Sequence, residues 1–174
     1  MDGETRMEAV VCGIDPGLGT MGYAVVDTRG GAVCVLDAGV CRFDPSASLA
    51  HRLVAVRRDM DAILLEHRPD IVAVEELYAH YKHPRTSILM GHARGVILMA
   101  AAEAGCGVRG YAATKIKKYL TGHGRATKIQ MQRAIQATLG LPDLPEPADV
   151  ADALAIALCG AADLRQPKPT EVGR

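Results

Sequence analysis

The chain has 174 residues, of which 49% are hydrophobic, so it is long enough for one α/β domain with a sizeable core and too short for two ordinary ones. No apolar stretch is long enough to span a membrane, and the first residues carry acids rather than an apolar signal core, which predicts a cytoplasmic protein with no membrane partner. Lys and Arg together number 20, as do Asp and Glu, so overall charge alone points to no class of partner.

The chain begins with three apolar runs separated by turn signals. Residues 9–15 form the first run, residues 21–27 the second and residues 32–43 the third, with Arg29-Gly30-Gly31 as the turn between the last two. Runs of this length joined by short Gly-rich turns predict an antiparallel meander of three strands.

Helices then alternate with two further strands. Apolar residues repeat every three or four positions from 49 to 64, after a capping candidate at 46–48, which predicts a helix that ends before Pro69. The continuous apolar run 71–74 predicts a strand buried on both faces. The elements predicted after it are a helix at 87–104 closed by Gly105, a strand at 108–113, a short helix opened by Thr114, a helix from Thr127 to Gly140 and a last helix from 148 to 164.

This order of elements predicts one α/β domain at 9–165, between a flexible segment at 1–8 and a disordered tail at 166–174. A meander followed by alternating helices and strands gives a five-stranded mixed sheet, three strands antiparallel and then two parallel, with helices on both faces. This is the layout of RNase H-like domains. The five cysteines show no CxxC spacing and most sit in apolar runs, so we expect reduced, buried thiols rather than zinc ligands or disulfides.

The zero net charge conceals a strong asymmetry along the chain. Residues 78–134 contain ten Lys and Arg residues and the single acid Glu103, so this segment carries 10 − 1 = +9 and the remainder carries −9. A basic segment combined with an acidic remainder suits a protein that holds a polyanion beside a site that needs carboxylates. The alternative is that the basic residues are scattered over a solvated surface.

Four acids are predicted to meet at one site. Asp15 and Glu75 each end a predicted strand, whereas Asp149 and Asp152 lie three positions apart at the start of the last helix and therefore share a face. Glu75 and Glu76 point to opposite faces of the sheet, so only one of them can serve this site, and the choice of Glu75 rests on the family resemblance given below. Four such carboxylates would repel one another unless divalent cations lay between them, and oxygen ligands suit Mg²⁺ or Mn²⁺. Two such ions could generate hydroxide and stabilise the leaving oxygen of a phosphodiester.

Each acid also has an ordinary structural explanation. Asp15 in Asp-Pro-Gly could be a turn residue, and Asp149 could be an acid favoured at a helix N-terminus by the helix dipole. Spacing alone supports a metal site and ordinary structural roles of these acids about equally.

Five short segments together resemble the RuvC family of crossover junction endonucleases, in the same order and at similar separations, over roughly residues 9–160. The segments are GIDPG at 13–17 with GY at 22–23, VEELY at 74–78, GHARG at 91–95, GHGRATK at 122–128 and DVADALAIA at 149–157. The resemblance implies an enzyme that nicks opposed strands of a four-way (Holliday) DNA junction. It also implies a homodimer that works with the RuvAB branch-migration machinery. Asp15, Glu75, Asp149 and Asp152 match the four catalytic, metal-binding acids of that family.

The resemblance also implies DNA contacts by particular residues. Tyr78 matches a family aromatic near the crossover, where an exposed ring could stack on an unpaired base, although it could equally be a core ring. Lys117 and Lys128 match family lysines near the cleaved strand, and Arg125 is a further phosphate candidate. The alternative for Lys117 is a solvated helix face shared with Lys118.

The loop at 78–85 departs from the family pattern by about one additional residue, which leaves the roles of Lys82, His83 and Arg85 open. Two other functions stay open at this point. A junction-binding clamp without chemistry would keep the basic surface, and an ATP-binding actin or sugar-kinase type of domain would use Asp15-Pro-Gly and the following glycines as a phosphate loop. Surplus apolar residues in the helix at 87–104 indicate the surface of dimerisation.

Overall fold

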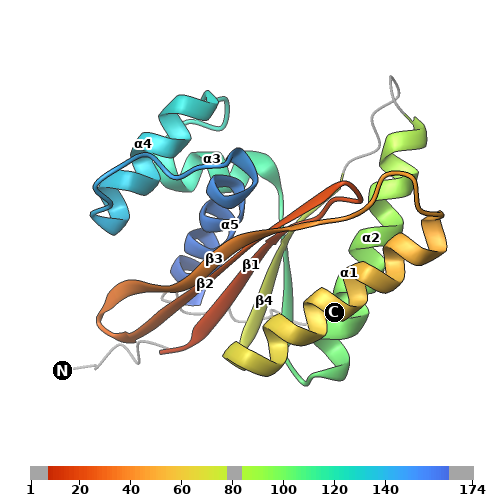
Figure 1. Cartoon of the computed structure of the whole chain (residues 1–174). Coiled ribbons are helices and arrows are strands. Elements are labelled where there is room, and N and C mark those ends of the chain that lie inside the picture. Colours follow the sequence, from red (N-terminus) through yellow and green to blue (C-terminus); the bar gives the residue numbers. More distant parts are fainter. Residues whose placement is uncertain (1–7, 78–83, 165–174) are drawn as a thin grey trace, which may run out of the picture.

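The structure is a computed structural model that describes residues 8–77 and 84–164. A central five-stranded sheet separates two layers of helices (Figure 1). The strand order is β3-β2-β1-β4-β5. The strands are β1 (Val10–Asp15), β2 (Thr20–Gly30), β3 (Ala32–Arg42), β4 (Ile71–Glu75) and β5 (Gly107–Tyr111).

The sheet confirms the predicted combination of strand directions. β1 pairs antiparallel with β2 and parallel with β4, β2 pairs antiparallel with β3, and β4 pairs parallel with β5. The hydrophobic runs explain why β1 and β4 occupy the centre, since nearly all of their residues are buried, as strands covered on both faces require.

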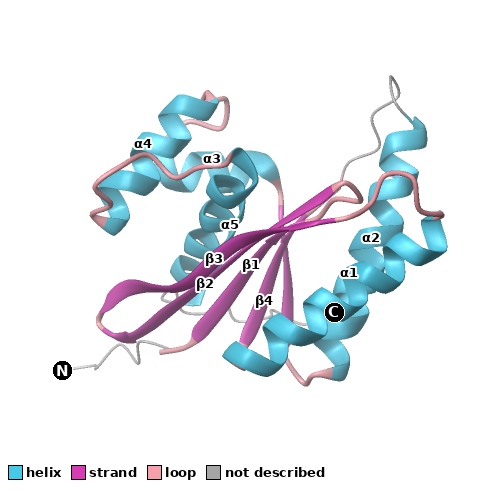
Figure 2. Ribbon diagram, viewed as in Figure 1, coloured by secondary structure: helices cyan, strands magenta, loops and turns pink. Residues whose placement is uncertain are grey.

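Two helices cover one face of the sheet and three cover the other (Figure 2). On the first face lie α1 (Leu49–His67) and α2 (Pro84–Glu103), which share a hydrophobic core with Cys12, Ile14 and Val72. On the second face lie α3 (Ala113–Thr121), α4 (Lys128–Leu139) and α5 (Ala148–Leu164), which enclose a separate core with Val11 and Ala73. Because side chains alternate along a strand, the two cores use alternate residues of β1 and β4.

The last helix packs against the sheet more closely than its sequence predicted. A Cβ atom at Gly13 would overlap backbone atoms of Ala153 and Ala157, so glycine at this position lets α5 approach β1 backbone to backbone. Gly160 sits similarly against Ala73, whose Cβ would be 3.0 Å from a Cβ at residue 160. Every α5 residue from 153 to 161 is buried, so this stretch of the helix is covered on all sides.

Most predicted helix ends are confirmed, with one correction. The Ser48 side chain caps α1, and Thr127 caps α4 in a capping box with Gln130. Thr114 does not open α3, because the N-cap is Ala112, whose side chain has no oxygen to make the capping hydrogen bond.

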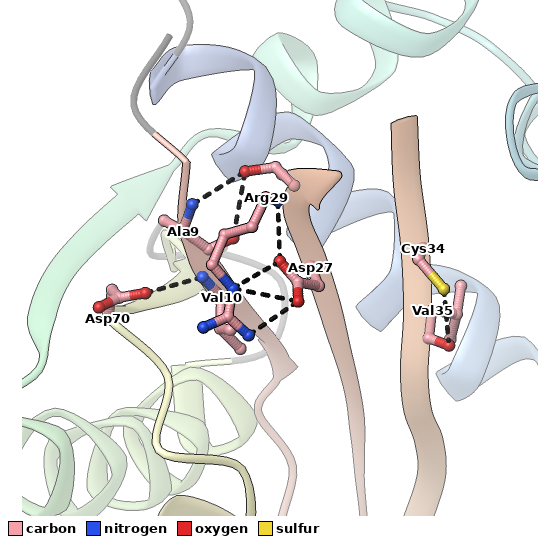
Figure 3. Close-up of polar contacts among 8 residues, drawn as sticks. Ala9, Val10, Asp27, Arg29, Cys34, Val35 and Asp70 are labelled. Carbon is pink, nitrogen blue, oxygen red and sulfur yellow. Dashed lines mark hydrogen bonds and ion pairs between the residues drawn. The ribbon is translucent and has the colours of Figure 1, made fainter. Parts of the chain in front are cut away.

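The amino-terminal end of β1 is fixed by polar contacts with β2 and with the loop before β4 (Figure 3). The Thr28 hydroxyl accepts a hydrogen bond from the amide of Ala9 at 3.0 Å, and the Asp70 carboxylate accepts one from the amide of Val10 at 2.8 Å. Asp27 pairs with Arg29 at 2.8 Å in the adjacent hairpin. These contacts lie at the opposite end of β1 from Asp15, which leaves the carboxyl end of the strand available for other groups.

The five cysteines are free, as expected, but only Cys12 and Cys159 are buried. Cys34 is exposed because it lies on β3, an edge strand, where an apolar run does not guarantee coverage on both faces. Within residues 8–77 and 84–164, no helix combines the length and apolar character that crossing a bilayer would require.

Candidate active site

The sheet register places the two strand-end acids next to each other. Ile14 of β1 lies opposite Val74 of β4 in a parallel pair, so the next residues along the two strands are Asp15 and Glu75. Both side chains are partly buried at the same carboxyl edge of the sheet. Parallel strands bring their carboxyl ends together at one edge, so the convergence follows from topology rather than from closeness in sequence.

The start of α5, the helix that packs on this face of the sheet, supplies the other two acids. The backbone of Asp149 lies against Gly22, the antiparallel partner of Asp15, and a Cβ at position 22 would overlap the Asp149 carbonyl oxygen. The Thr20 hydroxyl donates a hydrogen bond of 3.1 Å to the Asp149 carboxylate. Asp152 follows one helical turn later, so both α5 acids lie beside the end of β1.

The acids strongly perturb one another. The pKa of Asp15 is raised from 3.8 to about 7, chiefly by burial and then by the negative charges of Asp152, Glu75 and Asp149, while Lys128 lowers it. A carboxyl that resists ionisation for these reasons lies in a place of concentrated negative charge. Such a perturbation at a cleft is a mark of a functional site rather than of a turn residue.

Two lysines oppose this charge from the neighbouring helices. Burial is the main cause that raises the pKa of Glu75, with Asp152 adding to it and Lys117 lowering it. For Asp152, burial again raises the pKa, while Lys128 and then Lys117 lower it and Asp149 raises it. Lys117 of α3 and Lys128 of α4 therefore both lower the pKa values of acids that belong to other elements. Both cations lie at the same site as the carboxylates.

A pocket of about 200 Å³ joins these groups. Glu75 and Asp152 provide its acids, and Lys117 and Lys128 provide its cations. The remaining lining residues are apolar and come from α3, α4, α5 and the loop before α4, namely Ala113, Ile116, Ala126, Met131, Ala155 and Ile156. Low-dielectric walls around charged groups strengthen their effect on a charged ligand.

The donor set fits divalent cations by its chemistry. Four carboxylates from two strands and one helix supply hard oxygen ligands, and their mutual repulsion favours a cation between them. Across residues 8–77 and 84–164, no three His, Cys, Asp or Glu side chains stand in the arrangement of a formed metal site. The described carboxylates therefore share an electrostatic site without standing in a complete coordination geometry.

The predicted DNA-binding residues divide into three groups. Lys117 and Lys128 line the pocket, as the spatial argument expected. Arg125 is exposed in the loop before α4 and does not line the pocket. Tyr78 lies outside the described residues, as do Lys82 and His83. Arg85 is exposed near the start of α2.

Sequence reasoning missed two residues that hold the acids. Thr20 contacts Asp149, and the Arg94 guanidinium donates a hydrogen bond of 3.2 Å to the backbone carbonyl of Glu75. Arg94 stands in the GHARG segment at 91–95, so the signal was present in the sequence. The role of Arg94 could not be predicted from the sequence, because it binds a backbone carbonyl, a group that every residue has.

Comparison with known proteins gives one consistent family. A family model described as crossover junction endodeoxyribonuclease RuvC matches residues 11–160. A protein of that name from Rhodopirellula baltica is 50% identical over 150 residues, which cover 86% of this chain and 84% of the relative. The corresponding protein of Heliobacterium modesticaldum is 42% identical over 155 residues, which cover 89% of this chain and 95% of the relative.

Solved structures agree with the sequence comparison. Thermus thermophilus RuvC in complex with a Holliday junction substrate has a TM-score of 0.84 and 36% identity, covering 90% of this chain and 95% of that one. A yeast mitochondrial Holliday junction resolvase with a TM-score of 0.64 and 12% identity covers 89% of this chain and 80% of that one, and it supports the fold alone. The predicted RNase H-like fold is confirmed.

Proposed function

The chain belongs to the RuvC family of crossover junction endodeoxyribonucleases, and from that membership we propose that it resolves four-way DNA junctions by metal-dependent hydrolysis at the pocket beside β1, β4 and α5. The observation that carries the proposal is the electrostatic coupling of Asp15 to three other acids. A single strand-end acid could be a turn residue, whereas an acid whose ionisation is opposed by three neighbouring acids favours a cation between them.

In this mechanism the four carboxylates, Asp15, Glu75, Asp149 and Asp152, hold two Mg²⁺ or Mn²⁺ ions. When bound, such ions supply a hydroxide nucleophile and stabilise the leaving oxygen of the cleaved phosphodiester. The sheet holds the first two acids and α5 holds the other two, so the ligands come from rigid elements. Rigid support matters because catalytic groups must keep their geometry within a fraction of an ångström.

The lysines of the pocket bind the DNA backbone next to these acids. Lys128 occupies the first turn of α4, whose unpaired amide groups attract phosphate. The capping box at this end uses the neutral Gln130, and the first turn of α4 contains no acid, so the positive end of the helix keeps its full effect. Lys117 approaches the same pocket from α3. Arg125 would bind a further phosphate, and Tyr78 would stack on an unpaired base near the crossover.

We further propose that the protein acts as a homodimer, whose two active sites can nick opposed strands of the junction. The outer face of α2 is the best candidate for the subunit contact, because Ile88 is 62% exposed and Met99 is 48% exposed on that helix. Large exposed apolar side chains on one helix are typical of an interface. Cooperation with the RuvAB branch-migration machinery follows from the family resemblance.

The decisive experiment is cleavage of a synthetic four-way junction with Mg²⁺ or Mn²⁺. The wild-type protein should introduce symmetric nicks, whereas Asp15→Asn and Asp152→Asn should bind the junction and fail to cut it. Asp61→Asn is the matched control, because this acid is 51% exposed on α1 and paired with Arg57 away from the pocket.

Three outcomes would count against the proposal. Junction binding without nicks by the wild-type protein would favour the non-cleaving clamp. Undiminished cutting by either site variant would remove that residue from the catalytic set. Melting that depends on ATP instead of DNA would favour the sugar-kinase type of domain.

A further inference from the structure

One guanidinium binds the backbone of an active-site acid from the opposite face of the sheet. Arg94 lies in the middle of α2, and its Nε atom donates a hydrogen bond of 3.2 Å to the carbonyl oxygen of Glu75. Glu75 is the last residue of β4, where the chain leaves the sheet. A hydrogen bond from a charged donor is stronger than one between neutral groups, and an arginine keeps its charge at every accessible pH.

A glycine on the neighbouring strand leaves room for the Glu76 side chain beside Arg94. A Cβ at Gly110 of β5 would lie 3.4 Å from Nη2 of Arg94 and 3.0 Å from both Cγ and Oε1 of Glu76. The guanidinium and the Glu76 side chain therefore lie close together over the end of β5. The amide of Glu76 also donates to the carbonyl of Tyr111 at 2.9 Å, so the end of β4 is held to β5 as well.

Arg94 does not share the pocket with the acids. The rest of the pocket that contains Glu75 and Asp152 is lined from α3, α4, α5 and the loop before α4, whereas α2 covers the other face of the sheet (Figure 1). Alternation along the strand explains this arrangement, since Glu75 points toward α5 and Glu76 lies toward Arg94. Any effect of Arg94 on cleavage must therefore pass through the backbone of Glu75.

We propose that Arg94 is a positioning residue for the cleavage reaction, which fixes the backbone at Glu75 and so sets where that carboxylate enters the pocket. The inference rests on the proposed function, because it assumes that Glu75 is one of the metal-binding acids. Without this hydrogen bond, the carboxylate moves with the loosened strand end. Loss of a group that orients a metal ligand typically lowers activity or metal affinity by roughly 10- to 100-fold.

The test compares variants that remove the donor with one that replaces it. Arg94→Met keeps a long side chain but has no hydrogen-bond donor, and Arg94→Lys restores a charged donor of comparable reach. Arg57→Met is the matched control, because Arg57 is also a partly buried arginine and joins α1 to α2 through Asp61 and Glu103, far from the pocket. Each protein is measured for single-turnover cleavage, for junction Kd without metal and for the rise in Tm on adding Mn²⁺.

The expected pattern separates positioning from simple support of the fold. Arg94→Met should lower the cleavage rate by about 10-fold or more and reduce the Mn²⁺-induced rise in Tm, with junction Kd changed less than about threefold. Arg94→Lys should recover part of both losses, and Arg57→Met should change neither. Gly110→Ala presses on the Glu76 side chain, which lies beside the same guanidinium, and should reduce cleavage in the same direction but less, which keeps the proposal testable if Arg94→Met fails to fold.

Two results would overturn the inference while leaving the proposed function intact. The first is cutting by Arg94→Met at the rate of Arg57→Met, with an equal Mn²⁺ response. The second is a large increase in junction Kd at an unchanged cleavage rate, which would make Arg94 a DNA contact. Failure of the wild-type protein to cut any junction would instead refute the proposed function itself.

Discussion

Replacing Asp15 with Asn should make the metal-free protein more stable. The folded protein holds this carboxyl in a partly buried site beside three other acids, and its pKa is raised from 3.8 to about 7, first by burial and then by Asp152, Glu75 and Asp149. The folded state therefore disfavours the ionised form that the unfolded chain accepts freely. An amide of the same shape carries no charge, so it avoids this penalty.

The sign of the effect sets its pH dependence. Below pH 3.8 both the folded and the unfolded state hold the proton, so ionisation costs no stability. Between pH 3.8 and about 7 only the unfolded state ionises, and the cost increases with pH. Above about pH 7 both states are ionised and the cost stays constant at its largest value.

The size of the effect follows from the same two values. A pKa difference of about 3 corresponds to at most about 4 kcal/mol, at 1.36 kcal/mol for each pH unit. The carboxyl is only partly buried, so solvent screening reduces this limit, and we expect about 2 kcal/mol. For a domain of this size, that free energy corresponds to a rise in Tm of roughly 4–8 °C.

Thermal unfolding in EDTA at pH 5 and pH 8 provides the measurement. Asp15→Asn should melt higher than the wild-type protein at pH 8 and by a smaller margin at pH 5. Mn²⁺ should then raise the Tm of the wild-type protein more than that of the variant, because a ligand of the folded state stabilises it. Asp61→Asn, an exposed acid paired with Arg57, should show no such pH-dependent gain. A variant that is less stable than wild type at pH 8 would refute the electrostatic argument.

Three further predictions test the phosphate-binding end of α4 and the packing of α5. Gln130→Glu keeps the capping box with Thr127 but adds a negative charge beside Lys128, so junction Kd measured by mobility shift should rise by about two- to fivefold at unchanged Tm. Lys128→Ala should make the slope of log Kd against log salt concentration shallower by about one phosphate contact, and an unchanged slope would exclude a backbone contact. Gly13→Ala places a methyl group against the backbone of Ala153 in α5, and calorimetry should show a loss of about 3 kcal/mol or no folded protein.

The sequence predicted the elements well because their signals are local. Buried strands appear as continuous apolar runs, and the Ser48 and Thr127 caps and Gly140 mark helix ends with residues whose chemistry is specific. The convergence of Asp15 with Glu75 also followed from sequence, because the carboxyl ends of two adjacent parallel strands must lie at one edge. Pattern and topology therefore favoured a convergence of the acids, and the family resemblance decided which acids form the predicted site.

Contacts that depend on tertiary packing could not be predicted in the same way. The burial of α5 on all sides depends on how closely Gly13 and Gly160 let it approach the sheet, which no periodicity within the helix reveals. Cys34 lies in an apolar run but is exposed, because the position of β3 at the edge is a property of the whole sheet. The bond from Arg94 to a backbone carbonyl has no counterpart in side-chain spacing.

The charge asymmetry of the sequence acquires a physical meaning at the pocket. The four acids come from the acidic remainder of the chain, and the two lysines come from the basic segment 78–134. In the fold, both groups influence the pKa values of Asp15, Glu75 and Asp152. Without cations, the carboxylates would repel the phosphate that Lys117 and Lys128 attract. With cations between the acids, the same groups would present a positive surface to the DNA backbone. Metal binding and DNA binding at this site should therefore reinforce each other, since each removes an electrostatic cost of the other.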